Sequence, residues 1–449
     1  MTGSVPKPFN PSTLRETPSL RRAYVYAAVA TAFSLLGDVF MYTLLPVQFA
    51  DLGLGKKQVG VLLSMNRFVR LATNRLAGGV CDRAGVSRPF ILATALGACV
   101  CASYGLVRGF VLLLIGRCVW GLCWSFIRLG YLQTTVRHAA EKNLGAAMGV
   151  TSGLSRLGAL AGAALGGVLS DAIGFRRTAF VLAGLSALAV IPASLSQRYR
   201  PDRGRGGKRS DGFSGTEAPR GDSGGESPGA ATNPHAETRP APRGPLSLLG
   251  ANFAVGLVGG GIILSTLGRL LQERFAGQID VFGRALPVAT ATGFVLAMRW
   301  AVDIVFAPLM GGAADRWGRR RTICLSFAAG GTALLLVPGM QGFAPLVAAV
   351  LFLFFCGATA GIALSAEASV AVPPAGRNRY LSWFVTASDL GAACGPLLAW
   401  TAIDGVATRF VVIRPVALES VYVAGSVVYF GALALTLVGA QRRRRQRNP

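Results

Sequence analysis

The sequence predicts an all-α membrane protein with twelve transmembrane helices in two pseudo-symmetric six-helix bundles. Three observations lead to this fold class: the composition, the recurrence of long apolar segments, and one phrase that occurs twice. Hydrophobic residues make up 52% of the chain and charged residues 14%, whereas a soluble domain is about a quarter charged. Apolar segments of about 20 residues, the length that crosses a bilayer, recur along nearly the whole chain. Short alternating segments, which would indicate a transmembrane β-barrel, are absent from the sequence.

The breaks between the apolar segments define the candidate spans. In chain order they cover residues 23–50, 58–77, 89–107, 109–131, 144–170, 177–196, 247–272, 286–310, 321–340, 343–371, 379–404 and 417–440. The first span starts too far into the chain and is too long for a cleavable signal peptide.

Between the sixth and seventh spans the composition changes to Gly, Pro, Ser and charged residues, with little to bury. This predicts a disordered linker over residues 197–246. The linker separates an N-terminal bundle, 23–196, from a C-terminal bundle, 247–440, with tails at 1–22 and 441–449. Lys and Arg residues favour the linker side, so the positive-inside rule places both termini and the linker in the cytoplasm. We interpret the net charge of +25 as topology and contact with the lipid bilayer, with no nucleic-acid partner.

The repeated phrase indicates an internal duplication. GGVCDRAG, at Gly78–Gly85 after the second span, returns as GGAADRWG, at Gly311–Gly318 after the eighth span. The same shift aligns Ser64–Arg70 with Ala297–Asp303, methionine on methionine. Two parallel six-helix repeats are an architecture typical of secondary transporters.

These phrases resemble the signature loop GxxxDRxGRR of the major facilitator superfamily. The second copy matches it fully, and the first has Val86 and Ser87 where basic residues are usual. The matching positions are Gly78, Asp82, Arg83, Gly85, Gly311, Asp315, Arg316, Gly318, Arg319 and Arg320. The resemblance implies a gating role for them: small residues let span two approach a neighbour, and the aspartate latches onto a helix N-terminus of the other half. The alternative is a stable turn whose charge stays on the inner side.

Two further patterns support the resemblance. RCVWG, Arg117–Gly121, has the arginine and glycine that the superfamily carries in span four. GALAGAALGG, residues 158–167, partly meets the span-five pattern of drug–proton antiporters, with Ala163 where that pattern has proline. The proline version occurs in span eleven as GAACGP, residues 391–396.

Charged residues inside the spans mark the candidate site, because each is costly in a bilayer unless it is paired or faces water. At about 1.5 Å per helical residue, Asp38 and Arg117 lie at similar heights, roughly 22 and 21 Å from the inner ends of their spans. The resemblance associates such a pair with proton coupling. We assign proton coupling to Asp38, Arg117 and Asp389, with a purely structural ion pair as the alternative.

Substrate binding is expected on the arginine-rich faces. Arg67, Arg70 and Asn74 share one face of span two by their spacing, and Arg156 lies in the glycine-rich stretch of span five. Trp124 is a candidate for stacking, although an aromatic residue on a membrane helix more often serves packing. Three further expectations concern other charges: Arg299 and Asp303 neutralise each other, Glu367 partners loop charges, and Arg128 reaches to the inner surface.

The leading functional prediction is a secondary transporter that exports a small organic molecule, at least partly anionic, by proton-coupled alternating access. One alternative is an organic-anion uptake or exchange carrier without proton coupling. Another is a receptor or scaffold that resembles a transporter but moves nothing. No catalytic motif, metal-ligand cluster or cofactor motif is present in the sequence. We therefore expect a monomeric, non-enzymatic protein of a bacterial inner membrane, with protons and a small-molecule substrate as partners and no metal or cofactor.

Overall fold

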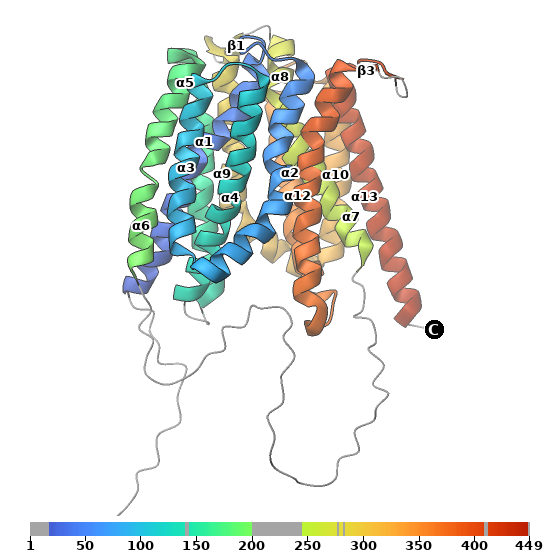
Figure 1. The fold of residues 1–449 in the computed structure, drawn as a ribbon. Coiled ribbons are helices and arrows are strands. Elements are labelled where there is room, and N and C mark those ends of the chain that lie inside the picture. Colours follow the sequence, from blue (N-terminus) through green and yellow to red (C-terminus); the bar gives the residue numbers. More distant parts are fainter. Residues whose placement is uncertain are drawn as a thin grey trace, which may run out of the picture.

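The described part of the chain is almost entirely helical and forms two bundles that stand side by side (Figure 1). The structure is a computed structural model that describes residues 18–139, 143–199, 245–275, 278–281, 283–407 and 412–447. Residues 1–17 and 200–244, which include most of the predicted N-terminal tail and linker, lie outside the described residues. We call the end of the bundles where residues 199 and 245 lie the linker end, and the opposite end the hairpin end.

The N-terminal bundle follows the predicted order of spans. Its helices are α1 (Pro18–Gln48), α2 (Lys56–Ala84), α3 (Ser87–Leu106), α4 (Phe110–His138), α5 (Leu144–Ala187) and α6 (Val190–Arg198). Gly174 has φ 80° and breaks α5 between the positions predicted for spans five and six. Only glycine adopts this conformation readily, so it is the turn between these two spans.

The C-terminal bundle repeats the arrangement with two short hairpins added. Its elements are α7 (Leu246–Val255), η3 (Gly256–Ile263), α8 (Leu264–Phe275), β1 (Gln278–Val281), β2 (Arg284–Pro287), α9 (Val288–Trp317), α10 (Arg319–Leu336), η4 (Val337–Gly339), α11 (Phe343–Val370), α12 (Pro374–Asp404), β3 (Val406–Ala407), β4 (Val412–Ile413) and α13 (Leu418–Arg447). Each hairpin is antiparallel. The predicted seventh span consists of α7, η3 and α8, and η3 is a π-helical segment that contains Gly259–Gly261. The predicted basic tail continues α13 as a helix.

The helix lengths are consistent with twelve spans. Within the described residues, nine stretches are long and apolar enough to cross a membrane, and one of them, Ala146–Ser196, covers predicted spans five and six. The predicted spans two and eleven correspond to α2 and α12, which have membrane-spanning lengths of 29 and 31 residues. Both carry charged residues, which lowers their hydropathy.

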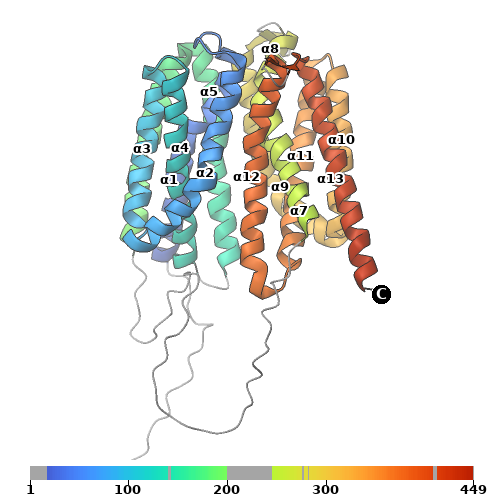
Figure 2. The ribbon, with the colours of Figure 1, turned by 45° about the vertical axis from the view of Figure 1, so that its right-hand side comes forward.

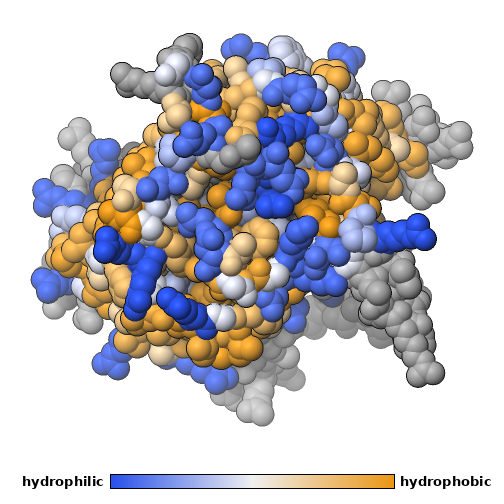
Figure 3. Space-filling view, turned by 90° about the horizontal axis from the view of Figure 1, so that it is seen from above, coloured by the Kyte–Doolittle hydropathy of each residue, from blue (hydrophilic) through white to orange (hydrophobic). Residues whose placement is uncertain are grey.

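The two bundles meet mainly through α2 against α12 and α5 against α9. Figure 2 shows α2 and α12 adjacent between the bundles. At the hairpin end, the ring of Trp400 meets the ring of Phe49 edge to face, with the ring centres 5.6 Å apart. Gly60 leaves room for the Trp400 side chain and the Pro396 backbone. These contacts close the hairpin end of the interface with buried apolar groups. Figure 3 shows hydrophilic residues gathered near the centre of this end and hydrophobic residues on either side.

Candidate functional site

Asp38 and Arg117 form a buried ion pair inside the N-terminal bundle. Arg117 Nη1 donates to Asp38 Oδ1, and Arg117 Nε donates to the Leu62 carbonyl oxygen at 3.1 Å. The Arg117 side chain is completely buried and that of Asp38 is 10% exposed. The predicted common height of the two residues is therefore confirmed, because α1 and α4 bring them into contact. Their role in proton coupling stays a prediction.

Tyr42 connects this pair to Arg67. The guanidinium carbons of Arg117 and Arg67 lie 5.2 and 5.3 Å from the centre of the Tyr42 ring. The hydroxyl group of Tyr42 donates to Asn66 Oδ1 at 3.2 Å. The negative face of an aromatic ring attracts a nearby cation, so Tyr42 stabilises both guanidinium groups in a low-dielectric region.

Arg67 reaches across the interface to backbone oxygens of the C-terminal bundle. Its Nη1 donates to the carbonyl oxygens of Gly260 at 2.7 Å and Ala392 at 3.0 Å. In a regular helix the Ala392 carbonyl would accept from residue 396, but Pro396 has no N–H to donate. Arg67 therefore satisfies a carbonyl that the proline leaves free. Its predicted role in substrate binding is untested, and this geometry gives it a structural partner.

Asp389, at the middle of α12, lies between two arginines of the other bundle. Its Oδ1 is 3.8 Å from Arg70 Nη2, and its Oδ2 is 3.4 Å from Arg128 Nη1. The prediction that Arg128 reaches to the inner surface is wrong, since the side chain instead points to Asp389 across the interface. Asn74, one turn beyond Arg70, is exposed.

A second charged contact joins α5 to α9. Arg156 Nη1 lies 3.7 Å from Asp303 Oδ2 and 3.4 Å from the Asp303 carbonyl oxygen. The predicted neutralisation of Asp303 by Arg299 is not formed as an ion pair. The carboxylate turns to Arg156 instead, and the Arg299 guanidinium lies over the rings of Trp300 and Phe354 at 4.6 and 5.2 Å.

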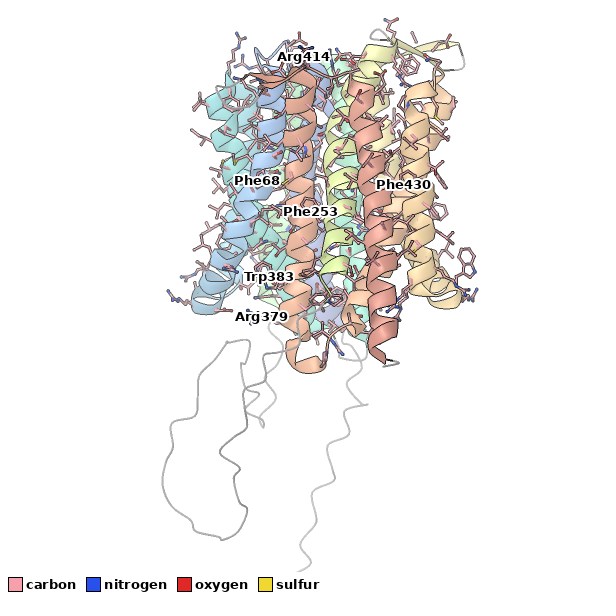
Figure 4. All side chains as sticks on the ribbon, turned by 90° about the vertical axis from the view of Figure 1, so that its right-hand side faces the viewer. Phe68, Phe253, Arg379, Trp383, Arg414 and Phe430 are labelled. Atoms are coloured by element: carbon pink, nitrogen blue, oxygen red, sulfur yellow. The ribbon has the colours of Figure 1, made fainter. Side chains whose placement is uncertain are left out.

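The predicted aromatic candidate Trp124 and the exposed Trp383 differ in their surroundings. Trp124 is partly buried and packs against the apolar core of the N-terminal bundle, which fits a packing role. Trp383 is exposed, and Figure 4 places it with Arg379 toward the linker end of α12, away from Arg414 at the hairpin end.

The signature loops lie at the linker end. Gly85 and Gly318 have φ values of 76° and 92° directly after α2 and α9, so glycine is needed at both turns. Glu367 accepts from Arg320 Nε at 3.0 Å, which confirms that it partners a loop charge. The other basic loop residues Arg83 and Arg316 are exposed, and Arg319 donates to the Ala366 carbonyl oxygen at 3.5 Å.

The expected latch is not formed by the first loop. Asp82 is exposed, with no hydrogen bond or ion pair to any described residue. A side chain added at Gly78 would meet no atom within 4 Å, so the predicted close approach of span two is also absent. In this arrangement the bundles are packed at the hairpin end instead. The side chain of Asp315 and the surroundings of Gly311 lie outside the described residues.

A contact of the expected latch type occurs at the hairpin end, where sequence reasoning missed it. Asp171 Oδ2 accepts from the Thr290 backbone N–H at 2.7 Å and from the Thr290 hydroxyl at 2.5 Å. Thr290 lies in the first turn of α9, so a carboxylate of the N-terminal bundle caps a helix of the other bundle. The sequence signal was an aspartate at the end of span five, opposite the predicted start of span eight.

The comparisons with known proteins agree with this architecture. The sequence matches the family profile described as Major Facilitator Superfamily over residues 27–282 and 284–449. The chain belongs to the Major Facilitator Superfamily. The family and the fold are those of a multi-pass membrane transporter rather than an enzyme.

Two curated relatives are tetracycline resistance proteins, class B of Escherichia coli and class H of Pasteurella multocida. They are 28% and 27% identical to this chain over 141 residues, which is 31% of this chain and 33% of each relative. The matched region thus spans about a third of the length of these proteins.

Solved structures with the same fold cover nearly the whole chain. A POT family transporter in complex with a thioalcohol-conjugated peptide has a TM-score of 0.70 at 12% identity, over 94% of this chain and 96% of that chain. A bacterial homologue of the human lysosomal transporter Spinster, inward-facing and occupied, has a TM-score of 0.67 at 15% identity, over 94% and 97%. The nucleoside transporter NupG has a TM-score of 0.63 at 13% identity, over 93% and 99%. At these identities the likeness concerns the fold.

Proposed function

We propose that this protein is a proton-coupled secondary transporter that exports a small organic molecule, at least partly anionic, by alternating access. The observation that carries the proposal is the buried Asp38–Arg117 pair beside an interface where arginines of one bundle contact the other. The partial similarity to two tetracycline resistance proteins supports export. The protein acts as a monomer, with its linker end on the cytoplasmic side of a bacterial inner membrane.

Asp38 is the group that takes up the proton in this proposal. It is the partner of a permanently charged guanidinium, and neutralising its carboxylate removes the attraction that holds Arg117 in place. Arg117 also contacts the Tyr42 ring, and the same ring contacts Arg67 at the bundle interface. A change of charge at Asp38 therefore acts on a chain of contacts that ends on the C-terminal bundle.

The decisive test is transport in proteoliposomes with an imposed pH gradient and a panel of radiolabelled anionic and cationic organic compounds. Asp38→Asn should lose gradient-driven accumulation of the transported compound by more than tenfold and retain exchange of labelled for unlabelled compound. Retained exchange shows that the variant is folded. If Asp38→Asn accumulates the compound as wild type does, the pair is structural and the coupling assignment is wrong.

Orientation is tested separately with reporter fusions after Gln197 and after Ala440, which flank the C-terminal bundle in the sequence. Both should report a cytoplasmic location. A periplasmic signal at either position would overturn the proposed topology.

A second candidate function is an organic-anion uptake or exchange carrier without proton coupling. It is favoured by the excess of arginine at mid-depth, where Arg70 and Arg128 share the single carboxylate of Asp389. The same proteoliposome assay separates the two candidates, since exchange that is insensitive to the pH gradient in wild type supports the carrier.

A further inference from the structure

The internal duplication extends to the charged residues between the bundles. The shift that brings Gly78 onto Gly311 also brings Arg70 onto Asp303 and Arg156 onto Asp389. Each of these two position pairs therefore carries arginine in the N-terminal half and aspartate in the C-terminal half.

Helix packing shows that this register holds in three dimensions. A side chain added at Gly158 of α5 would collide with the α1 backbone at Ala32, and one added at Gly391 of α12 would collide with the α7 backbone at Phe253. Gly158 and Gly391 are equivalent under the same shift. One turn further, Gly162 packs against Leu36 and Gly395 against Leu257. The fifth span of each repeat thus packs in the same way on the first span of its own bundle.

The two cross-bundle ion pairs are consequently one contact formed twice, with the charges reversed between the halves. Arg70 of α2 lies 3.8 Å from Asp389 of α12, and Arg156 of α5 lies 3.7 Å from Asp303 of α9. All four residues lie near the middle of their membrane-spanning segments. In both contacts the N-terminal bundle supplies the cation and the C-terminal bundle supplies the anion.

In neither contact does the guanidinium group form a hydrogen bond to the aspartate carboxylate, because the nitrogen and oxygen lie 3.8 and 3.7 Å apart. At 3.8 Å the Arg70–Asp389 contact is longer than a hydrogen bond, and the buried Arg70 Nε has no hydrogen-bond partner among the described residues. Arg128 competes for the same carboxylate. Arg156 keeps 38% of its side chain exposed and Arg128 keeps 33%. A buried donor without an acceptor, as at Arg70 Nε, costs free energy, and the partly exposed guanidinium groups of Arg156 and Arg128 remain accessible, so this region favours an additional anion.

We propose that Arg70 and Arg156 are two equivalent anion-binding groups for the cargo, and that Asp389 and Asp303 are resident counter-ions displaced by a carboxylate or phosphate group of the cargo. This inference rests on the proposed transport function and names the chemistry of its site. A planar guanidinium binds such a group through two parallel hydrogen bonds, which the resident aspartates do not form here.

Displacement has a consequence for the bundles, because each aspartate belongs to the bundle opposite its arginine. When a cargo anion binds the guanidinium group and displaces the aspartate, an ion pair between the two bundles is lost. Occupancy of the site is thereby linked to the freedom of the two bundles to move against each other. In the empty protein the same bridges hold the halves together at mid-depth.

The test measures anion binding to the purified full-length protein in detergent, by calorimetry and thermal shift, with ionic strength held constant by NaCl. The probes are benzoate, phenyl phosphate and tetraphenylphosphonium. Asp389→Asn and Asp303→Asn should each lower the Kd for benzoate or phenyl phosphate about tenfold, because each removes the competing carboxylate. Arg70→Gln and Arg156→Gln should each raise it about tenfold. A purely structural ion pair would not gain affinity when its carboxylate is neutralised.

The matched control is Glu273→Gln, which removes a carboxylate from the Arg269–Glu273 pair on α8, away from the mid-depth interface. It should leave anion binding unchanged. Because the two sites are equivalent, one folded aspartate variant is enough to test the proposal.

Unchanged anion affinity in a folded aspartate variant would overturn the role of the counter-ions. If the cation tetraphenylphosphonium stabilises the wild-type protein and neither anionic probe does, the proposed anion site as a whole is wrong. Proton-driven transport of a cation in the proteoliposome assay would then show that coupled transport survives the failure of this inference.

Discussion

The two six-helix bundles share one repeat, yet they divide the buried charge unequally. The N-terminal bundle contains both partners of its own ion pair, Asp38 and Arg117, and sends further arginines to the interface. At mid-depth the C-terminal bundle supplies Asp303 and Asp389, whose carboxylates lie near these arginines. The internal pair is sealed within one bundle, whereas the cross-bundle pairs are longer and partly exposed. We propose that the sealed pair responds to a proton and that the cross-bundle pairs exchange with a ligand.

The packing of the fifth span on the first span, by contrast, is nearly the same in both halves. The glycines of α5 and α12 allow each helix to approach the first span of its own bundle. Duplication thus preserved the helix contacts while the charges diverged. Packing is constrained by overlap of atoms at a few ångströms, whereas the sign of a charge can change if the partner changes too.

The largest expected effect comes from breaking the sealed pair. Arg117→Leu leaves the Asp38 carboxylate buried and uncompensated, which should lower the free energy of unfolding by about 3–5 kcal/mol. The combined Asp38→Asn, Arg117→Leu variant should be less destabilised than Arg117→Leu alone, because no charge is left unpaired. Thermal melting of the purified proteins checks both expectations. Equal melting temperatures for wild type and Arg117→Leu would contradict a stabilising role for the pair.

The next effect tests whether the two halves really pack alike. Gly158→Ala and Gly391→Ala each force a methyl group into a neighbouring backbone, so each should destabilise the protein by about 1–3 kcal/mol. Gly149→Ala, in the same helix as Gly158 but facing open space, should be neutral or stabilising. The melting temperatures of the three variants show whether the two glycines are equally important for packing. A large effect at only one of the two equivalent glycines would break the symmetry.

Charge coupling across the interface should be smaller, since these pairs are partly solvated. Double-mutant cycles with Arg70→Gln and Asp389→Asn, and with Arg156→Gln and Asp303→Asn, should give similar coupling energies of about 1 kcal/mol or less. Raised NaCl concentration should reduce both values. Coupling at only one pair would mean that the repeat-related contacts are not equivalent.

The smallest effect is expected for the contact at the hairpin end. Asp171→Asn weakens the cap on α9 and should cost about 1 kcal/mol in stability of the closed hairpin end. A cysteine introduced at Ala289, which packs beside Gly167 at this contact, should then react faster with a water-soluble maleimide. An unchanged labelling rate would show that the cap does not hold this end closed.

Much of this protein could be predicted from its sequence. The length and spacing of the apolar segments determine the membrane-spanning helices, since each must satisfy its own backbone in lipid. The repeated loop phrase reveals the duplication, and the rise per residue is enough to place Asp38 and Arg117 at one height. Glu367 was correctly expected to partner a loop arginine.

Only the tertiary structure decided which charges meet across the interface. A helical rise fixes the depth of a residue but not the neighbour that faces it, so Arg128 was expected at the surface and Arg299 beside Asp303. The actual partners come from α12 and α5, helices far away in sequence. Pro396 likewise predicts a carbonyl oxygen without its helical hydrogen bond, but only the packing of α2 on α12 shows that Arg67 donates to it. The depth of a residue in the membrane is set by its position along its own helix, whereas its partner depends on how the two bundles are oriented and packed against each other.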